Sequence, residues 1–183
     1  MQSTTATDTR HHLFDTAFGV AGIAWGERGI TRFQLPSSDR HAVERRIGAR
    51  GAPSNPPPQV MDAVAQARSY FEGARPDFSG VALDLAGIDP FRRQIYDVLL
   101  TVRYGETLTY GELAVKIGAP DGAQAVGQAM GSNPIPLIIP CHRVLAAGGK
   151  SGGFSAPGGI NTKRRLLAIE SVHARGEPTL FDR

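Results

Sequence analysis

The chain has 183 residues, 41% of them hydrophobic, which is enough for one ordinary domain or two small ones with a packed interior. No stretch approaches the roughly 20 apolar residues that span a bilayer, and the polar residues 1–10 do not resemble a secretory signal, so we expect a soluble, cytoplasmic protein and no membrane partner. The net charge is +3, and the surplus lies in residues 101–183, with 9 basic against 6 acidic residues, which favours an anionic partner for that half.

The first half of the chain alternates predicted strands and helices after residues 1–10, which we expect to be disordered. Apolar residues 18–25 and 30–35 flank a turn at 26–29, a pattern typical of a β-hairpin. A short helix within 37–50, a proline-rich loop at 51–58, a helix from about 60 to Gly73 and a strand over 81–85 follow. Residues 11–86 are therefore expected to form a small α/β domain with a β-sheet, of the ribonuclease-H-like kind, without catalytic residues.

Three helices are predicted in the second half. Asp89 is a good N-cap and Pro90 suits the first turn, so a helix is expected from there to about Tyr104. Thr109-x-x-Glu112 is a capping box that begins a helix over 110–117, and a glycine-containing turn leads to a helix over 122–131. This arrangement is typical of a helix-turn-helix, although a simple α-hairpin is commoner. The last helix has no Lys or Arg and many small residues, which favours contact with a DNA backbone or narrow groove.

The only cysteine, Cys141, follows an apolar run at 136–139 that we expect to be a short buried strand ended by Pro140. One cysteine excludes an intramolecular disulfide and argues against a cysteine-based zinc site. The neighbouring His142 favours the thiolate, which is the nucleophilic form. The alternative is that Cys141 is a small buried hydrophobic residue, as most free cysteines are.

Three blocks of sequence stand in an order that resembles a known family. They are 87–91 with 104–114, then Ala125-Val-Gly127 with Asn133-Pro134, then Ile139-Pro-Cys-His-Arg-Val144 through Gly158-Gly159 to Lys163 and Glu170. Together they resemble the O6-alkylguanine-DNA alkyltransferases, also called methylated-DNA–protein-cysteine methyltransferases. The resemblance implies an α/β (α+β) fold with a mostly helical DNA-binding and alkyltransferase domain over 87–171, a tail over 172–183, and no cofactor or metal.

For catalysis, the resemblance implies direct repair in which a damaged guanine is flipped out of the duplex and its alkyl group moves to Cys141. Because a thioether is not easily hydrolysed, each molecule would act once. His142 would be a water-mediated base that keeps Cys141 as thiolate, and Glu170 would orient His142. Thr162 is expected to cap the helix that carries Glu170. Asn133 would join the helix-turn-helix to the cysteine segment, with a helix C-cap as the alternative.

For binding, the implied partner is double-stranded DNA that carries O6-alkylguanine, contacted through the minor groove by a monomer. Tyr110 would press on the phosphate beside the flipped nucleotide, or be a core aromatic residue. The Val144 carbonyl would contact the guanine amino group, and Ser155 the O6 region. The remaining implied substrate residues are Phe154 and Lys163, and the implied DNA contacts are Thr109, Ala123, Gln124, Ala125, Gly127 and Gly131. Arg143 is expected to be structural and to pair with backbone carbonyls.

The sequence departs from the family pattern at two places. Gln124 stands where the family normally has an arginine that fills the gap left by the flipped base, and glutamine lacks its charge and stacking plane. Ala156-Pro157 has the form of a two-residue insertion after Ser155. Two other functions stay open at this point: a non-catalytic module that binds alkyl lesions, and a thiol hydrolase or redox sensor built on Cys141 and His142.

Overall fold

The computed structural model describes residues 9–48 and 51–171, and the chain divides into two compact units, residues 1–86 and 87–183. The fold is α+β, as predicted. Most of residues 1–10 and the whole tail over 172–183 lie outside the described residues, but Arg10 already begins strand β1, so the expected disorder does not extend to it. None of the described helices is long and apolar enough to cross a membrane.

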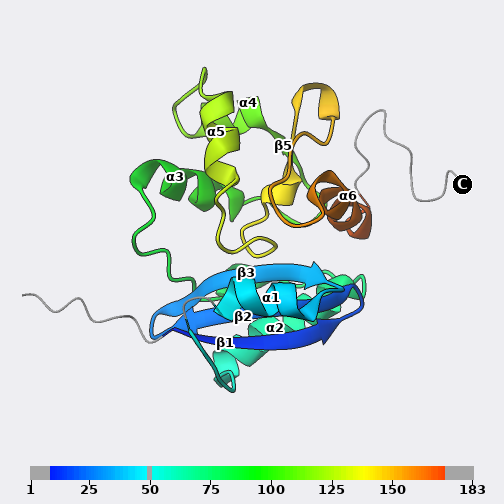
Figure 1. Ribbon diagram of the computed structural model, residues 1–183. Coiled ribbons are helices and arrows are strands. Elements are labelled where there is room, and N and C mark those ends of the chain that lie inside the picture. The colour runs from blue at the N-terminus through cyan, green and yellow to red at the C-terminus, as the bar shows by residue number, and fades with distance from the viewer. Residues whose placement is uncertain (1–8, 49–50, 172–183) are drawn as a thin grey trace, which may run out of the picture. The chain divides into compact units, whose positions relative to one another are not determined.

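Unit one is a four-stranded sheet with two helices (Figure 1). Its elements are β1 (Arg10–Thr16), β2 (Gly19–Gly26), β3 (Gly29–Ser37), α1 (Arg40–Gly48), β4 (Ala52–Pro53), α2 (Pro58–Phe71) and the 3-10 turn η1 (Phe78–Gly80). The order is β3-β2-β1-β4, with β1, β2 and β3 antiparallel and β4 parallel to β1. The predicted hairpin is the β2–β3 pair, and the predicted helices are α1 and α2.

The two helices pack on opposite faces of this sheet. A Cβ at Gly22 would lie 3.2 Å from both Ile47 of α1 and Leu13 of β1, so these share one face. On α2, Arg68 lies over the ring of Phe14, with 5.6 Å from its Cζ to the centroid. Because neighbouring strand residues point to opposite faces, Leu13 and Phe14 assign α1 and α2 to different sides. Helices on both faces account for the run of consecutive buried residues in β2.

Two details of unit one differ from the sequence prediction. The strand expected over 81–85 is wrong, because Leu83 makes an isolated bridge to Ile30. On either side of Leu83, the Ala82 carbonyl accepts from the Ile30 amide and the Asp84 amide donates to the Ile30 carbonyl. The proline-rich loop at 51–58 contains β4, which pairs with the start of β1. Both pairings depend on partners distant in sequence, so neither leaves a local pattern.

Unit two contains four described α-helices and the cysteine segment (Figure 1). Its elements are α3 (Pro90–Leu99), β5 (Leu108–Thr109), α4 (Tyr110–Lys116), α5 (Ala123–Met130), the 3-10 turn η2 (Cys141–Arg143), β6 (Val144–Leu145), the turn η3 (Ala147–Gly149) and α6 (Gly159–Ile169). The predicted helices are found, but α3 ends five residues before Tyr104. Parallel pairing of Leu108 with Val144 and Thr109 with Leu145 brings the start of α4 beside the segment that follows η2.

The predicted strand over 136–139 is wrong, because this segment is a compact turn. The Ile139 amide donates to the Ile135 carbonyl (2.9 Å), Pro136 and Ile139 form an isolated bridge, and Leu137 has φ 80°. Prolines lack the amide that a strand ladder needs. The apolar run reflects burial instead, since the Leu137 and Ile139 side chains lie in the core.

The caps of the unit-two helices agree with the sequence except at α6. Asp89 accepts from the Arg92 amide, and Thr109 and Glu112 form the complete capping box. The α6 N-cap is Gly158 in the left-handed conformation, not Thr162. The hydroxyl of Thr162 instead donates back to the Pro157 carbonyl (2.7 Å), which fixes the first turn of α6 from inside.

Removing the capping hydroxyl is expected to destabilise unit two measurably. Thr109→Ala leaves the Glu112 amide without its 3.1 Å partner, which costs about 1 kcal/mol in the free energy of unfolding. Urea denaturation without DNA measures this change. Thr101→Ala is the control, because that hydroxyl donates to the exposed end of α3 and is expected to contribute less. Equal losses in the two variants would contradict the capping role.

Candidate active site

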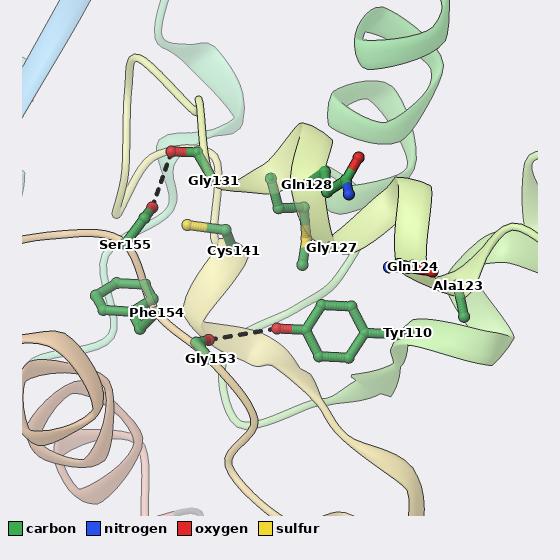
Figure 2. Close-up of a pocket in the computed structure, with 11 residues that line it drawn as sticks. Tyr110, Ala123, Gln124, Gly127, Gln128, Gly131, Cys141, Gly153, Phe154 and Ser155 are labelled. Atoms are coloured by element: carbon green, nitrogen blue, oxygen red, sulfur yellow. Dashed lines mark hydrogen bonds between the residues drawn. The ribbon is translucent and has the colours of Figure 1, made fainter.

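Cys141 lies in the wall of a cavity of about 590 Å³ in unit two (Figure 2). The cavity is bounded by the start of α4, by one face of α5 and by the segment 153–155. Its lining residues are Tyr110, Ala123, Gln124, Gly127, Gln128, Met130, Gly131, Cys141, Gly153, Phe154 and Ser155. The thiol is 7% exposed. A reactive group is therefore presented to a cavity whose other wall is the second helix of the helix-turn-helix.

Two hydrogen bonds tie the segment 153–155 to the helix-turn-helix on either side of the thiol. The Ser155 hydroxyl donates to the Gly131 carbonyl at the end of α5 (2.9 Å). The Tyr110 hydroxyl donates to the Gly153 carbonyl (3.3 Å). Figure 2 shows both contacts, and together they define the width of the cavity at Cys141.

Asn133 connects the end of α5 to the turn before the cysteine. Its side-chain amide donates to the Ile139 carbonyl (2.9 Å), and its side-chain oxygen accepts from the Ile135 amide (3.0 Å). Its own backbone amide bonds the Met130 carbonyl at the α5 terminus (3.1 Å). The Asn133 side chain also acts to lower the pKa of the Cys141 thiol. Asn133 therefore links the end of α5 to the cysteine segment, whereas the C-cap of α5 is Gly131 and not Asn133.

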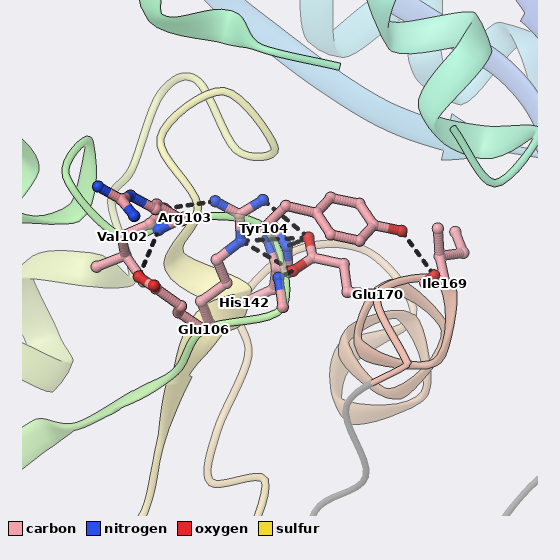
Figure 3. A network of polar contacts seen from close by, with 9 residues as sticks. Val102, Arg103, Tyr104, Glu106, His142, Ile169 and Glu170 are labelled. Carbon is pink, nitrogen blue, oxygen red and sulfur yellow. Dashed lines mark hydrogen bonds and ion pairs between the residues drawn. The ribbon is translucent and has the colours of Figure 1, made fainter. Parts of the chain in front are cut away.

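Behind Cys141, a buried polar network joins η2 to the end of α6 (Figure 3). His142 Nε2 lies 2.8 Å from Glu170 Oε1, and both side chains are fully buried. The Arg143 guanidinium donates to both Glu170 oxygens, with Nε–Oε2 at 2.9 Å and Nη2–Oε1 at 3.0 Å. Glu170 is the C-cap residue of α6, one turn after Leu166 on the inward face. Arg143 donates to the Val102 carbonyl (2.7 Å), as expected, but its ion pair with Glu170 was not predicted.

Burial dominates the titration of these groups. It raises the pKa of the Cys141 thiol, while the Asn133 hydrogen bond and the Lys163 charge act in the opposite direction. Burial also lowers the pKa of His142, against the opposing effect of Glu170 and with the charges of Arg143 and Lys163 acting the same way. For Glu170, burial alone would raise the pKa, but hydrogen bonds and charges from His142 and Arg143 lower it to about 2. At neutral pH the site therefore holds a neutral imidazole beside an ionised carboxylate.

Lys163 is a completely buried lysine on α6. Its ammonium donates to the Val144 carbonyl at 2.5 Å and to the Gly153 carbonyl at 3.4 Å, and it lies 5.7 Å from the centroid of the Tyr110 ring. The carbonyl that the resemblance assigns to the guanine amino group thus already accepts a hydrogen bond from Lys163. A base that uses this oxygen must share it with, or displace, the ammonium.

The structure brings together most, but not all, of the residues expected in the site. Eight line the cavity: Tyr110, Ala123, Gln124, Gly127, Gly131, Cys141, Phe154 and Ser155. Asn133, His142, Glu170, Val144 and Lys163 form the layer behind it, whereas Thr109 caps α4 and Ala125 is on the exposed side of α5. Sequence reasoning missed Gln128, Met130 and Gly153. Gln128 was detectable, because positions 124, 127, 128 and 131 share one helix face.

No metal centre is indicated for this site. Within residues 9–48 and 51–171, no group of three or more His, Cys, Asp or Glu side chains is placed to hold a metal ion. The chemistry that the described site offers is that of a thiol, an imidazole and a buried carboxylate in series.

Comparisons with known proteins identify the family of this chain. The family profile described as "6-O-methylguanine DNA methyltransferase, DNA binding domain" matches residues 90–172. The methylated-DNA–protein-cysteine methyltransferase of Mycobacterium tuberculosis is 50% identical over 126 residues, covering 69% of this chain and 74% of that protein. The mouse protein of the same name is 32% identical, covering 92% and 84%. A crystal structure of Mycobacterium tuberculosis OGT in complex with DNA superposes with TM-score 0.73 and 40% identity, covering 88% of this chain and 92% of that one. The chain therefore belongs to the methylated-DNA–protein-cysteine methyltransferase family.

Proposed function

We propose that this protein repairs DNA by moving the alkyl group of O6-alkylguanine onto its own Cys141, once per molecule. The observation that carries the proposal is the position of the single thiol, which opens into a cavity walled by the second helix of a helix-turn-helix. A nucleophile in that position meets a base only when the base has left the duplex stack. As the family resemblance implies, the proposed substrate is double-stranded DNA approached through its minor groove, and the proposed acting unit is a cytoplasmic monomer.

The transfer step is a displacement at the alkyl carbon. His142 takes the proton of Cys141, through a water molecule, and Glu170 stabilises the resulting imidazolium across its 2.8 Å contact. The sulfur then forms a bond to the alkyl carbon as the carbon–O6 bond breaks. The electron pair of the broken bond stays on the guanine, which takes up one proton, balancing the proton that His142 removed from Cys141, and regains its normal pairing edge. The thioether is stable, so the protein is not regenerated.

The cavity residues supply the fit to the base. Tyr110 and Phe154 offer aromatic surface on the α4 side and the loop side of the thiol. The Ser155 hydroxyl, which donates to the Gly131 carbonyl in the protein alone, would donate to the O6 region of the bound base. The small residues Ala123 and Gly127 let α5 approach the DNA closely.

Intact-mass measurement tests the proposal directly. The protein is incubated with a duplex containing one O6-methylguanine, or with the same duplex containing guanine. The lesion duplex is expected to add the mass of one CH2, located on the peptide that contains Cys141. An unchanged mass with lesion binding retained would support a non-catalytic binding module instead. Reversible thiol oxidation or hydrolytic turnover without DNA would support the hydrolase or redox sensor.

A second prediction concerns base flipping at Gln124. Gln124→Arg is expected to increase the rate of methyl transfer from duplex DNA about tenfold, because a hydrogen bond from a charged group contributes about 1.5 kcal/mol or more. Single-turnover rates on duplex and single-stranded substrates measure this. Gln128→Arg adds the same charge one turn away on the same face and serves as the control. No gain for Gln124→Arg, or an equal gain in both variants, would contradict a specific role for position 124.

A further inference from the structure

Arg143 makes four hydrogen bonds and one aromatic ring contact in the buried network. Its Nε donates to both oxygens of Glu170 (3.2 and 2.9 Å) and its Nη2 to Oε1 (3.0 Å). Its Nη1 donates to the Val102 carbonyl (2.7 Å), and its Cζ lies 6.0 Å from the centroid of the Tyr104 ring. A planar fork with two bonds to one carboxylate is a geometry that lysine cannot reproduce.

These contacts fix the orientation of Glu170. Oε1 accepts from Arg143 and faces His142 Nε2, while Oε2 accepts from Arg143 and from the Gly105 amide (3.0 Å). A rotation of the carboxylate would break contacts on both oxygens at once. The position of the imidazole therefore depends on Arg143, although Arg143 does not contact the cavity.

The same contacts balance charge around the imidazole. The charged groups that act on His142 are Glu170 and Lys163 from α6, and Arg143 from its own segment. With Arg143 and Glu170 both ionised, that pair is neutral, and a proton on His142 would add a buried cation near two others. Without the guanidinium, the Glu170 charge would be left for His142 to compensate, which favours the imidazolium. An imidazolium cannot accept the proton of Cys141.

We propose that Arg143 is a positioning residue for alkyl transfer: it holds both oxygens of Glu170 and balances their charge, and so keeps His142 neutral and able to accept a proton. The inference rests on the proposed function for its consequence, the proton transfer from Cys141, but its charge effect exists in the protein without DNA. Arg143 acts through Glu170 and His142 and not on the substrate.

The test is the titration of His142, followed by NMR of the full chain without DNA and assigned with His142→Gln. Arg143→Met is expected to move the midpoint upward by about one pH unit or more. Glu170→Gln is expected to move it downward, and Arg143→Met/Glu170→Gln to return it toward the wild-type value. Arg143→Lys retains the charge and is expected to shift the midpoint least. If Arg143→Met does not fold, the double variant compared with Glu170→Gln isolates the same charge.

Methyl transfer from the lesion duplex provides the second readout. The acid limb of its pH profile is expected to move upward in Arg143→Met by the same amount as the His142 midpoint. A purely structural role would lower the rate equally at every pH and leave both midpoints unchanged, and that result would overturn the inference. Shifted His142 midpoints in a protein that takes up no methyl group would instead contradict the proposed function alone.

Discussion

Cys141→Ser is expected to abolish methyl uptake while leaving lesion binding intact. Removing an enzyme's nucleophile reduces its rate on the order of 10⁶-fold, which is below detection in a single-turnover assay. The surroundings of Cys141 favour a thiolate nucleophile, since the Asn133 side chain and the Lys163 charge both act to lower the pKa of the thiol. The same hydrogen bond and charge would not ionise a serine hydroxyl. The measurement is protein mass after incubation with the lesion duplex, paired with a binding assay.

The binding assay makes the serine variant informative. Serine is smaller than cysteine and is accommodated in a position that is 7% exposed, so the variant should remain folded. Because this is the only cysteine, no other thiol can replace it as acceptor. Methyl uptake at another residue in Cys141→Ser would contradict the assignment of the acceptor.

Among the buried polar side chains of the site, Glu170→Ala is expected to be the most destabilising single substitution. It removes the carboxylate that Arg143 and His142 share and leaves a buried guanidinium without its ion-pair partner. Breaking one side of such a pair costs about 3–5 kcal/mol in the free energy of unfolding. Methyl transfer should also slow by about 10²–10⁴-fold, because the base loses its orientation. Urea denaturation and single-turnover rates measure the two effects.

Glu106→Ala is the matched control for that variant. Glu106 is an exposed carboxylate that accepts from the Arg103 amide, so its removal should change stability by less than about 0.5 kcal/mol. A comparable loss in both variants would show that the Glu170 network contributes little.

The low pKa of Glu170 adds a pH dependence to the same experiment. Because the folded-state pKa is about 2 and the ordinary value is 4.5, the stabilisation is complete above pH 4.5 and is lost as pH falls toward 2. The stability difference between wild type and Glu170→Gln should therefore shrink between these two pH values. A constant difference would contradict the shifted titration.

The features that the sequence predicted well are those that depend on residues close together in the chain. Asp89, Thr109 and Glu112 satisfy the amides of their own helix starts, so the capping pattern identifies the helix before any tertiary contact is known. The Cys141–His142 pair and its family motif likewise lie within a few residues. Most of the predicted site residues lie in one cavity and the layer behind it, whereas Thr109 and Ala125 do not.

The features that were missed depend on partners far along the chain. Arg143 meets Glu170 across 27 residues, and no periodicity connects the two positions. The apolar run over 136–139 predicts a strand, but continuous apolarity reports burial and not conformation. Its reversal at Leu137 follows from the neighbouring prolines and from the bonds of Asn133, which the hydrophobic pattern does not contain.

The isolation of Cys141 has a consequence for the cell that makes this protein. Cys141 lies in the wall of the cavity, and the chain has no second thiol that could accept another alkyl group. Each repaired lesion therefore uses one protein molecule. Repair capacity is then a number of molecules and not a rate. Measured against a known dose of lesions, the fraction of alkylated protein would count how many bases have been corrected.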